Sequence, residues 1–430
     1  MNTNSEYMTP DLLGSTYLYS DSAAANTSFC FVAGLTMAVD RSLLEQALED
    51  LMPRFPHFNL EAVREGESYV FRERHSPVPV MPVEERKGFS ESGVFGHECL
   101  LAVFVNHKTV YFDFHRALTD EKGVVPFIRA VLYRYLQLGG YEVENDGSVI
   151  TAGSEFHGIE ADDAFVRLDD IPASRPVWYM DAKAVKLPEG NPHDRFSVTQ
   201  IHVPLSKIKG EARLYTGMPS TIVSPFFSHA LLEEYPQADV PGEFIISYIQ
   251  VNLRQYFPTT TFRPFFVNLP LTYNRKLSEY PVATVLMSQK KFLEAQLKQD
   301  ALAYNAQRKI GLLEDILDVV PLESRIFAMK DMIRKKAAGS TYSICNIGSV
   351  IMPETMLRHI VEFYPVVPPV MFPFGISTIN FKGELVITVS SSNPGNQACR
   401  RFASLMKQYE IPAFISETYE YSTLKYNPEL

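Results

Sequence analysis

The sequence has few of the features that mark metal-binding, secreted or membrane-spanning chains. Its four cysteines, Cys30, Cys99, Cys345 and Cys399, lie far apart and form no CxxC pair, so they provide neither a zinc pattern nor a disulfide framework. No apolar run approaches the roughly 18 residues of a membrane span. The opening MNTNSEYMTPDLLGS lacks the basic and apolar regions of a signal peptide. We therefore expect a soluble, cytoplasmic protein with reduced cysteines, no metal site and no membrane span.

An excess of positive charge is also absent. The chain has 40 Lys and Arg against 50 Asp and Glu, which gives a formal net charge of −10. This balance argues against nucleic acid as the main partner, because phosphate backbones require a basic surface. A small phosphorylated ligand on a local basic patch is compatible with this balance. With 430 residues, of which 46% are hydrophobic and 12% aromatic, the chain is long enough for two well-packed domains.

One stretch, Thr109–Leu138, predicts a strand, a polar corner and a long helix. In Thr109–His115, apolar residues alternate with Tyr, Asp and His, which is the period-two pattern of a strand. From Thr119 the apolar residues recur at helical spacing, so we expect Thr119 to cap a helix that Gly139 and Gly140 end. His115, Arg116 and Asp120 would then meet at the corner, where a histidine base beside an orienting carboxylate is possible. An ordinary polar surface turn is the alternative.

Strands and helices mix in both halves, with hairpins as well as crossovers, which favours an α/β fold of two layered domains side by side. Residues 139–192 are polar and rich in Pro and Gly, so we expect a crossover, packed onto a domain by Trp178. The boundary is placed here, giving domains 1–192 and 193–430. The expected strands are Ser28–Val39, Phe58–Arg64, Ser68–Glu73, Cys99–Asn106, Thr109–His115, Phe196–Val203, Glu243–Leu253, Pro264–Leu271, Ser340–Ile347 and the hairpin of Ser377–Phe381 and Glu384–Ser390, which turns on Lys382-Gly383. The expected helices are Arg41–Met52, which Asp40 caps, and Ser206–Leu214, Ile222–Glu234, Val285–Ile316, Glu323–Ala337, Pro353–Phe363 and Asn396–Tyr409.

Four segments in order resemble the chloramphenicol acetyltransferase-like, or condensation-domain, superfamily, in particular its bacterial alcohol acetyltransferase branch. The corner RALTDEKGVVPF resembles the HALTDG-type sequence that follows a strand in that branch. The other segments are VNLRQYFPTTTFRPFF (Val251–Phe266), TYSICNIGSVIMPETM (Thr341–Met356) and the closing hairpin GISTINFKGELVITVS (Gly375–Ser390). Each alone is weak, but the ordered set spans most of the chain.

The resemblance implies two chloramphenicol acetyltransferase-like α/β sandwich domains with a channel between them. Members of the superfamily transfer an acyl group from a thioester to a hydroxyl or amine, and a histidine deprotonates the acceptor. Four residues after the histidine, an aspartate pairs with an arginine. This chemistry needs an activated nucleophile and a stabilised oxyanion but no metal. By resemblance, the aspartate is Asp120 and the arginine is Arg254 at the end of a strand.

The chain departs from this pattern at the base. The residue four before Asp120 is Arg116, and the following family glycine is Glu121. An arginine cannot act as a general base because its guanidinium stays protonated. In one interpretation His115 replaces it through a shift of the corner, although neighbouring strand residues face opposite sides.

Two other interpretations remain open. A second-half histidine, His229 or His202, could enter the channel, although for each of them a structural role is the more common case. Alternatively, the chain has lost acyl transfer and keeps the fold for binding or assembly.

Further ligand contacts are expected along the channel. Ser343 and Asn346 could line it and donate hydrogen bonds to a thioester oxygen, or Asn346-Ile347-Gly348 could form a loop without a chemical role. The basic runs Arg334-Lys335-Lys336 and Lys290-Lys291 could bind the phosphates of coenzyme A, with Lys335 and Lys336 as the main candidates, or could be solvated helix faces.

The sequence therefore predicts an acyl-CoA-dependent O-acyltransferase of alcohol acetyltransferase type. Its activity could be impaired, because Arg116 occupies the usual position of the base. It would hold no tightly bound cofactor and would use a coenzyme A thioester as co-substrate. The alternative is a non-catalytic binding or assembly protein with the same fold. An open channel that reaches His115 would favour the enzyme, and a channel blocked at Arg116 would favour the alternative.

Overall fold

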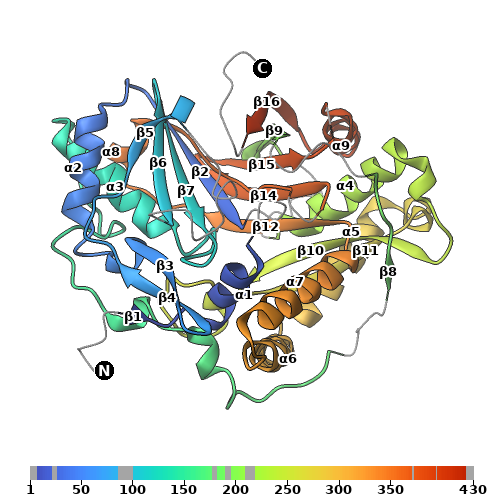
Figure 1. Ribbon diagram of the computed structural model, residues 1–430. Helices are drawn as coiled ribbons and strands as arrows, with labels where there is room; N and C mark the ends of the chain where they lie inside the picture. The colour runs from blue at the N-terminus through green and yellow to red at the C-terminus, as the bar shows by residue number, and fades with distance from the viewer. Residues whose placement is uncertain are drawn as a thin grey trace.

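The computed structural model describes residues 7–21, 27–85, 100–176, 182–188, 195–208, 218–369, 372–393 and 395–422. Two sheets with their covering helices lie side by side, and a short N-terminal helix lies between them (Figure 1). Cys99, Trp178 and most of the helix predicted at Ser206–Leu214 fall outside the described residues. The part of that helix that is described is a single 3-10 turn, Leu205–Lys207.

The first sheet has five strands in the order β13-β2-β7-β6-β5. These are β13 (Ile360–Val366), β2 (Ser28–Leu35), β7 (Thr109–His115), β6 (Leu101–Asn106) and β5 (Val80–Pro82). The helices α2 (Arg41–Leu51) and α3 (Val125–Leu138) pack together on one side of it (Figure 1). Asp40 caps α2 as predicted, because its carboxylate accepts the backbone N–H groups of Ser42 and Leu43. The strand predicted at Thr109–His115 is confirmed.

The second sheet has eight strands and forms the other half of the molecule. Its order is β11-β10-β12-β14-β15-β9-β16, and β8 also pairs with β10. Helices α4 and α9 pack against each other, and α5 and α6 contact β11. The bounds are β8 (Lys183–Ala184), β9 (Arg195–Pro204), α4 (Ser220–Glu234), β10 (Glu243–Asn252), β11 (Phe266–Tyr273), α5 (Val282–Gln296), α6 (Gln299–Leu317), β12 (Tyr342–Ser349), β14 (Phe374–Phe381), β15 (Glu384–Ser391), α9 (Gln397–Gln408) and β16 (Phe414–Ser422).

Two predictions in the second half are wrong. The helix expected at Pro353–Phe363 is only the short α8 (Glu354–Leu357), after which the chain becomes β13 and pairs antiparallel with β2. The apolar and β-branched run that begins at Ile360 suits a buried strand, and pairing with the first sheet stabilises it. The long helix expected at Val285–Ile316 is instead two helices, which separate around Leu297 and Lys298. Strand β16 was not predicted.

The N-terminal segment fills the region between the halves. Strands β1 (Tyr7–Met8), β4 (Ser68–Glu73) and β3 (Leu60–Glu65) form a small third sheet. Helix α1 (Leu12–Ser20) packs against α6 and α7 (Leu322–Ala338) of the second half. Because β13 also crosses to the first sheet, the two predicted domains share elements rather than meeting at one simple boundary. Among the described helices, none combines the length and hydropathy needed to cross a bilayer.

Candidate functional site

The polar corner after β7 is longer than the sequence predicted. Helix α3 begins at Val125, not at Thr119, and Pro126 occupies its first turn, where a missing N–H is tolerated. The predicted cap by Thr119 is wrong, because its hydroxyl donates to the carbonyl of Phe262 at 2.7 Å instead. The corner is therefore held by the segment that follows β10, and not by a helix of its own.

Asp120 is the centre of this attachment. Its carboxylate accepts the backbone N–H of Gly123 at 2.6 Å, within the corner, and that of Phe265 at 2.8 Å, in the other half. Arg254 Nη1 lies 2.9 Å from the same carboxylate, so the ion pair implied by the resemblance is present in the structure. Asp120 is 2% exposed. It ties the corner to the second half through both charge and backbone hydrogen bonds, which suits an anchoring role.

His115 is buried in a hydrogen-bond network and does not face an open space. The Ala117 N–H donates to its Nδ1 at 3.1 Å, and its Nε2 lies 2.6 Å from Thr27 Oγ1. Because the Thr27 hydroxyl donates to Asp21, it accepts from His115, and we assign the proton of the neutral ring to Nε2. The side chain is 0% exposed. Both ring nitrogens are thus engaged in the fold, and the hypothesis of His115 as a displaced base is not supported by this geometry.

Arg116 points to the opposite side and is held by Glu121. The two side chains form a close ion pair, in which Arg116 is 13% exposed and Glu121 0%. Gln250 of β10 donates to the other carboxylate oxygen at 2.9 Å. The guanidinium lies 5.3 Å from the ring centre of Phe29 and 5.9 Å from that of Tyr17. Burial lowers the pKa of Arg116, but Glu121 and Tyr17, with a smaller contribution from Cys345, together outweigh burial and raise the pKa.

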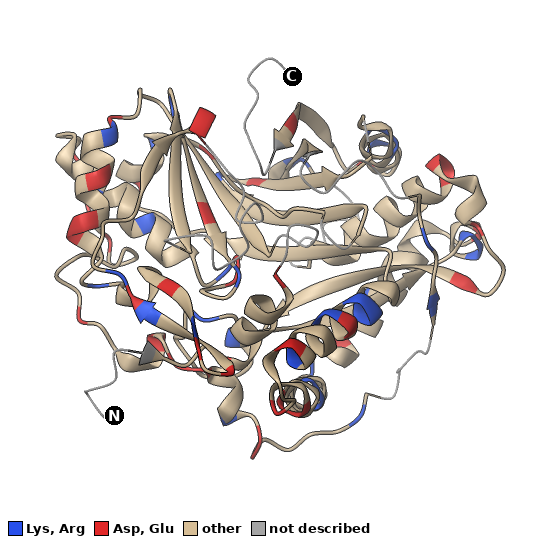
Figure 2. Ribbon diagram, in the orientation of Figure 1, with Lys and Arg blue, Asp and Glu red and all other residues tan. Residues whose placement is uncertain are grey.

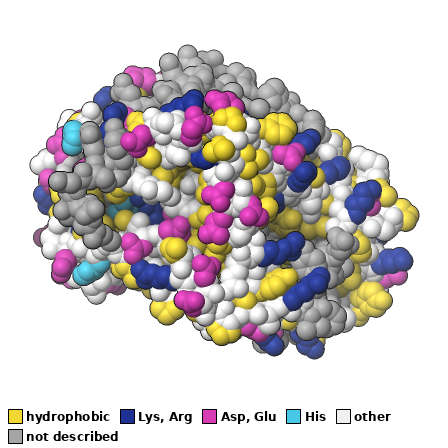
Figure 3. All heavy atoms as spheres, turned by 60° about the horizontal axis from the view of Figure 1, so that its bottom comes forward, with side chains coloured by type: hydrophobic (Ala, Val, Ile, Leu, Met, Phe, Trp, Pro, Cys, Tyr) yellow, Lys and Arg dark blue, Asp and Glu magenta, His cyan; other side chains and the backbone are white. Residues whose placement is uncertain are grey.

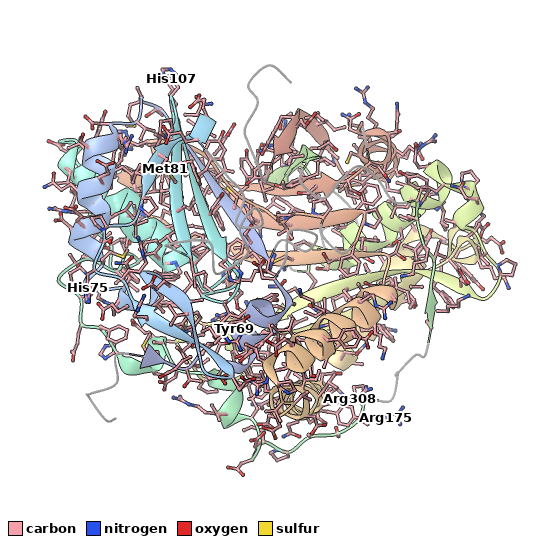
Figure 4. The ribbon with its side chains drawn as sticks, in the orientation of Figure 1. Tyr69, His75, Met81, His107, Arg175 and Arg308 are labelled. Atoms are coloured by element: carbon pink, nitrogen blue, oxygen red, sulfur yellow. The ribbon has the colours of Figure 1, made fainter. Side chains whose placement is uncertain are left out.

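A cavity of about 640 Å³ lies between the two halves and reaches this arginine. The lining comes from α1, the start of β2, Arg116, strands β10, β11 and β12, and helices α6 and α7. Its size is in the range of small-molecule sites. The cavity opens to solvent along α6, because lining residues on that helix, such as Arg308 and Leu312, are exposed. Its inner end is closed, because the lining residue Cys345 near Arg116 is buried. Arg308, labelled in Figure 4, lies on the outward side of α6.

The cavity contains only some of the predicted site residues. Ser343 and Arg116 line it. Within the described part of the chain, the lining includes no histidine and not Asn346. The Asn346 side chain instead accepts the Gly348 N–H at 3.0 Å and the Thr378 hydroxyl, so it stabilises the bulge in β12.

The two second-half histidines are structural in this geometry. His229 contacts the Tyr273 hydroxyl at 3.0 Å and lies 3.4 Å from Glu233, and burial lowers its pKa. His202 pairs with Glu384 on the neighbouring strand β15 at 2.7 Å. The prediction that His229 lines the channel is therefore wrong, since its contacts lie elsewhere.

Of the two main candidates for binding the phosphates of coenzyme A, one lines the cavity and the other does not. Lys336 lines the cavity, whereas Lys335 is exposed on the same helix and pairs with Asp331 at 2.7 Å. Neither Lys290 nor Lys291 belongs to the lining formed by the described residues. Figure 2 shows how basic and acidic residues alternate along α7. The cofactor role of Lys335 loses its support, because the helix turns that side chain into solvent.

The sequence did not reveal two features of the site. Lys309 of α6 lines the cavity together with Lys336, but a single lysine in an amphipathic helix has no distinguishing pattern. Glu121 was recognised only as a departure from the family glycine. The pairing of this carboxylate with Arg116 could have been suspected, because an acid and a base five residues apart in one corner can meet.

No family model matches the sequence, and no curated protein sequence matches it. Solved structures do match. Polyketide synthase associated protein 5 from Mycobacterium tuberculosis is similar with a TM-score of 0.61 and 13% identity, over 92% of this chain and 96% of that one. The condensation domain of the Monacolin K polyketide synthase is similar with a TM-score of 0.55 and 11% identity, over 95% and 99%.

A third similar structure carries small molecules. It is a variant of the starter condensation domain of rhizomide synthetase in complex with C8-CoA and Leu-SNAC, with a TM-score of 0.53 and 11% identity over 94% of each chain. At these identities the similarity establishes the fold alone. The chain therefore has the two-part condensation-domain fold, as the resemblance predicted.

Proposed function

We propose that this protein binds an acyl thioester, of the coenzyme A class, in the cavity between its halves, and that it does so without the histidine-based acyl transfer typical of this fold. The observation that carries the proposal is the Arg116–Glu121 ion pair in the cavity wall. A guanidinium cannot accept a proton from an acceptor hydroxyl. It can, however, donate hydrogen bonds to a thioester carbonyl.

The cavity suits an acyl group joined to a narrow polar arm. Most of its lining is apolar, and polar side chains such as Tyr248, Gln250 and Ser343 project into it from adjacent strands. Such a mixture binds the apolar chain by burial and fixes the polar arm by a few hydrogen bonds. The similar rhizomide synthetase domain, which is in complex with C8-CoA and Leu-SNAC, supports this choice of ligand.

Acyl transfer is the second candidate function, and the position of Arg116 is the observation that favours it. A cation in the cavity wall could stabilise the oxyanion that forms when an acceptor attacks the thioester carbonyl. An uncharged amine would need no protein base for the attack. Collapse of the tetrahedral intermediate would then break the carbon–sulfur bond, and the proton lost by the nitrogen would finally reside on the released thiol. An alcohol acceptor would require a base that this wall does not provide.

Calorimetric titration with octanoyl-pantetheine, a thioester without phosphate groups, tests the binding. We expect saturable binding by the natural protein. The variant Ser343→Phe, which fills the cavity, should weaken it at least about tenfold. Ser349→Phe, the same change at an exposed position on the same strand, is the matched control. Absence of binding, or equal binding by both variants, would refute the proposed site.

Release of free coenzyme A thiol from octanoyl-CoA separates binding from transfer. The assay would use a panel of alcohols and amines with the natural protein, Arg116→Met, Arg116→His and His115→Ala, and release that His115→Ala alone abolishes would show that His115 acts as the base after all. We expect no acceptor-dependent release by the natural protein. Release that Arg116→Met abolishes would establish the second candidate instead. Activity that appears only in Arg116→His would show an otherwise intact site that lost its base.

A further inference from the structure

Two lysines from different helices line the wall of the cavity. Lys309 comes from α6 and Lys336 from the last turns of α7. The Lys309 amine donates to the carbonyl of Phe266 at 3.2 Å and lies 4.8 Å from the centre of that ring. Figure 3 brings forward the lower side of Figure 1, where both helices lie, and shows Lys and Arg side chains beside apolar ones on this face.

Neither amine has an acidic partner among the residues that the structure describes. Their contacts there include no carboxylate within 4.0 Å, unlike Lys335, which pairs with Asp331. Burial lowers the pKa of Lys309 well below its ordinary range, and Lys336 adds to this effect. Burial also lowers the pKa of Lys336 to about 8. Asp11 acts in the opposite direction on Lys309, although it lies beyond ion-pair distance, and an anion bound between the two amines would offset both their repulsion and their burial.

The two lysines lie on the side of the cavity formed by α6 and α7, with Lys309 beside Phe266 at the start of β11 and Lys336 in the last turns of α7. On β10, Tyr248 and Gln250 both face the cavity, and Gln250 binds Glu121 at the Arg116 end. Tyr248 extends the other way, because a Cβ atom at Gly339, three residues after Lys336, would lie 3.0 Å from its hydroxyl. Apolar residues of α6 and α7, including Leu313 and Ile333, line the wall near the lysines.

We propose that Lys309 and Lys336 form an anion subsite that binds the negatively charged group of an amphiphilic ligand, whose apolar chain lies against the apolar lining of the cavity. This inference rests on the proposed function in that the same cavity holds the ligand. It adds a requirement that the first proposal does not make, since the ligand must carry a carboxylate or a phosphate at the α6–α7 end. Lysine amines bind either group through charge-assisted hydrogen bonds.

Calorimetric titration with four probes of one chain length tests this subsite. Octanoate, octyl phosphate and octanoyl-CoA are anionic, and octanoyl-pantetheine is neutral. We expect at least one anionic probe to bind at least about tenfold more tightly than the neutral thioester. The double variant Lys309→Met/Lys336→Met should remove this preference. Lys335→Met, on the same helix but outside the cavity, is the matched control, and a thermal melt of each variant verifies folding.

The outcomes distinguish this inference from the proposed function. Equal affinity for octanoyl-CoA, octanoate, octyl phosphate and the neutral thioester, or an unchanged preference in the double variant, would refute the subsite while leaving the cavity site intact. Octanoate or octyl phosphate binding that depends on the two lysines, without any thioester binding, would support the subsite and refute the acyl thioester. Failure of every anionic probe to bind the folded protein would also refute the subsite. The stronger of octanoate and octyl phosphate identifies the head group as carboxylate or phosphate.

Discussion

Arg116 and Glu121 lie five residues apart in one corner of the chain and form an ion pair that closes part of the cavity wall. Glu121 is fully buried and has Gln250 as its other partner. The pair thus joins the corner of the first half to β10 of the second. It also fixes a guanidinium at the position where the family resemblance implies an imidazole.

Breaking this ion pair on one side should be more harmful than removing it. Arg116→Leu leaves the buried Glu121 carboxylate without its cation, so we expect a loss of about 3 kcal/mol in the free energy of unfolding. The double variant Arg116→Leu/Glu121→Leu should recover more than half of this loss. Urea unfolding of the two single variants and the double variant measures the coupling. Arg358→Leu, which removes an exposed pair with Glu354, should change stability by less than about 0.5 kcal/mol, and a similar small effect at Arg116 would contradict the argument.

Asp120 should be essential for the junction between the halves. In Asp120→Asn the NH2 group that replaces one carboxylate oxygen cannot accept a hydrogen bond, so either the Phe265 N–H or the Gly123 N–H loses its acceptor, and the negative charge opposite Arg254 is lost. We expect a loss of about 2–4 kcal/mol. Asp331→Asn, which affects only exposed ion pairs on α7, should cost less than about 1 kcal/mol. Urea unfolding compares the two, and equal midpoints would show that Asp120 is not an anchor.

Gly123 is expected to tolerate no side chain. A Cβ atom there would lie 2.4 Å from the carbonyl oxygen of Phe262 and 2.9 Å from Arg254 Nη2. Because the first of these is backbone in the other half, Gly123→Ala must separate the corner from that segment, at a cost of about 1–3 kcal/mol. Gly153→Ala is the matched control, since a Cβ atom there would meet nothing within 4 Å. Thermal unfolding measures the midpoint of each variant. An equal decrease in the midpoints of Gly123→Ala and Gly153→Ala would contradict the prediction that Gly123 tolerates no side chain.

Asp11 should make stability depend on pH. Burial and the nearby Asp163 raise the pKa of Asp11 from 3.8 to about 7, whereas Arg263 acts in the opposite direction. The folded state therefore binds the proton more tightly than the unfolded state. The free energy of unfolding contributed by this group falls as the pH rises from about 4 to about 7 and is constant above that.

The variant Asp11→Asn isolates this contribution. Its side-chain oxygen can still accept the Gly14 N–H that caps α1. The stability of Asp11→Asn relative to the natural protein should rise by up to about 1 kcal/mol per pH unit between pH 5 and pH 7. Urea unfolding at several pH values measures this difference. A difference that does not change with pH would exclude Asp11 as the titrating group.

The sequence by itself determined the local elements whose stability depends on neighbouring residues. The alternation in Thr109–His115 predicted β7, and Asp40 predicted the start of α2. Lys382 and Gly383 predicted the turn between β14 and β15, and both adopt the positive φ angles that this tight turn requires. In each case the deciding contact lies within a few residues, so pattern and capping were sufficient.

Only the tertiary structure decided the features that depend on distant partners. The corner remains non-helical as far as Val125 because Thr119 and Asp120 form hydrogen bonds with a segment some 140 residues later in the chain. Segment Ile360–Val366 is a strand because it pairs with β2 at the edge of the first sheet. Lys309 and Lys336 share a wall because α6 and α7 pack beside the same cavity. Local sequence does not encode such contacts, since their free energy comes from groups that only folding brings together.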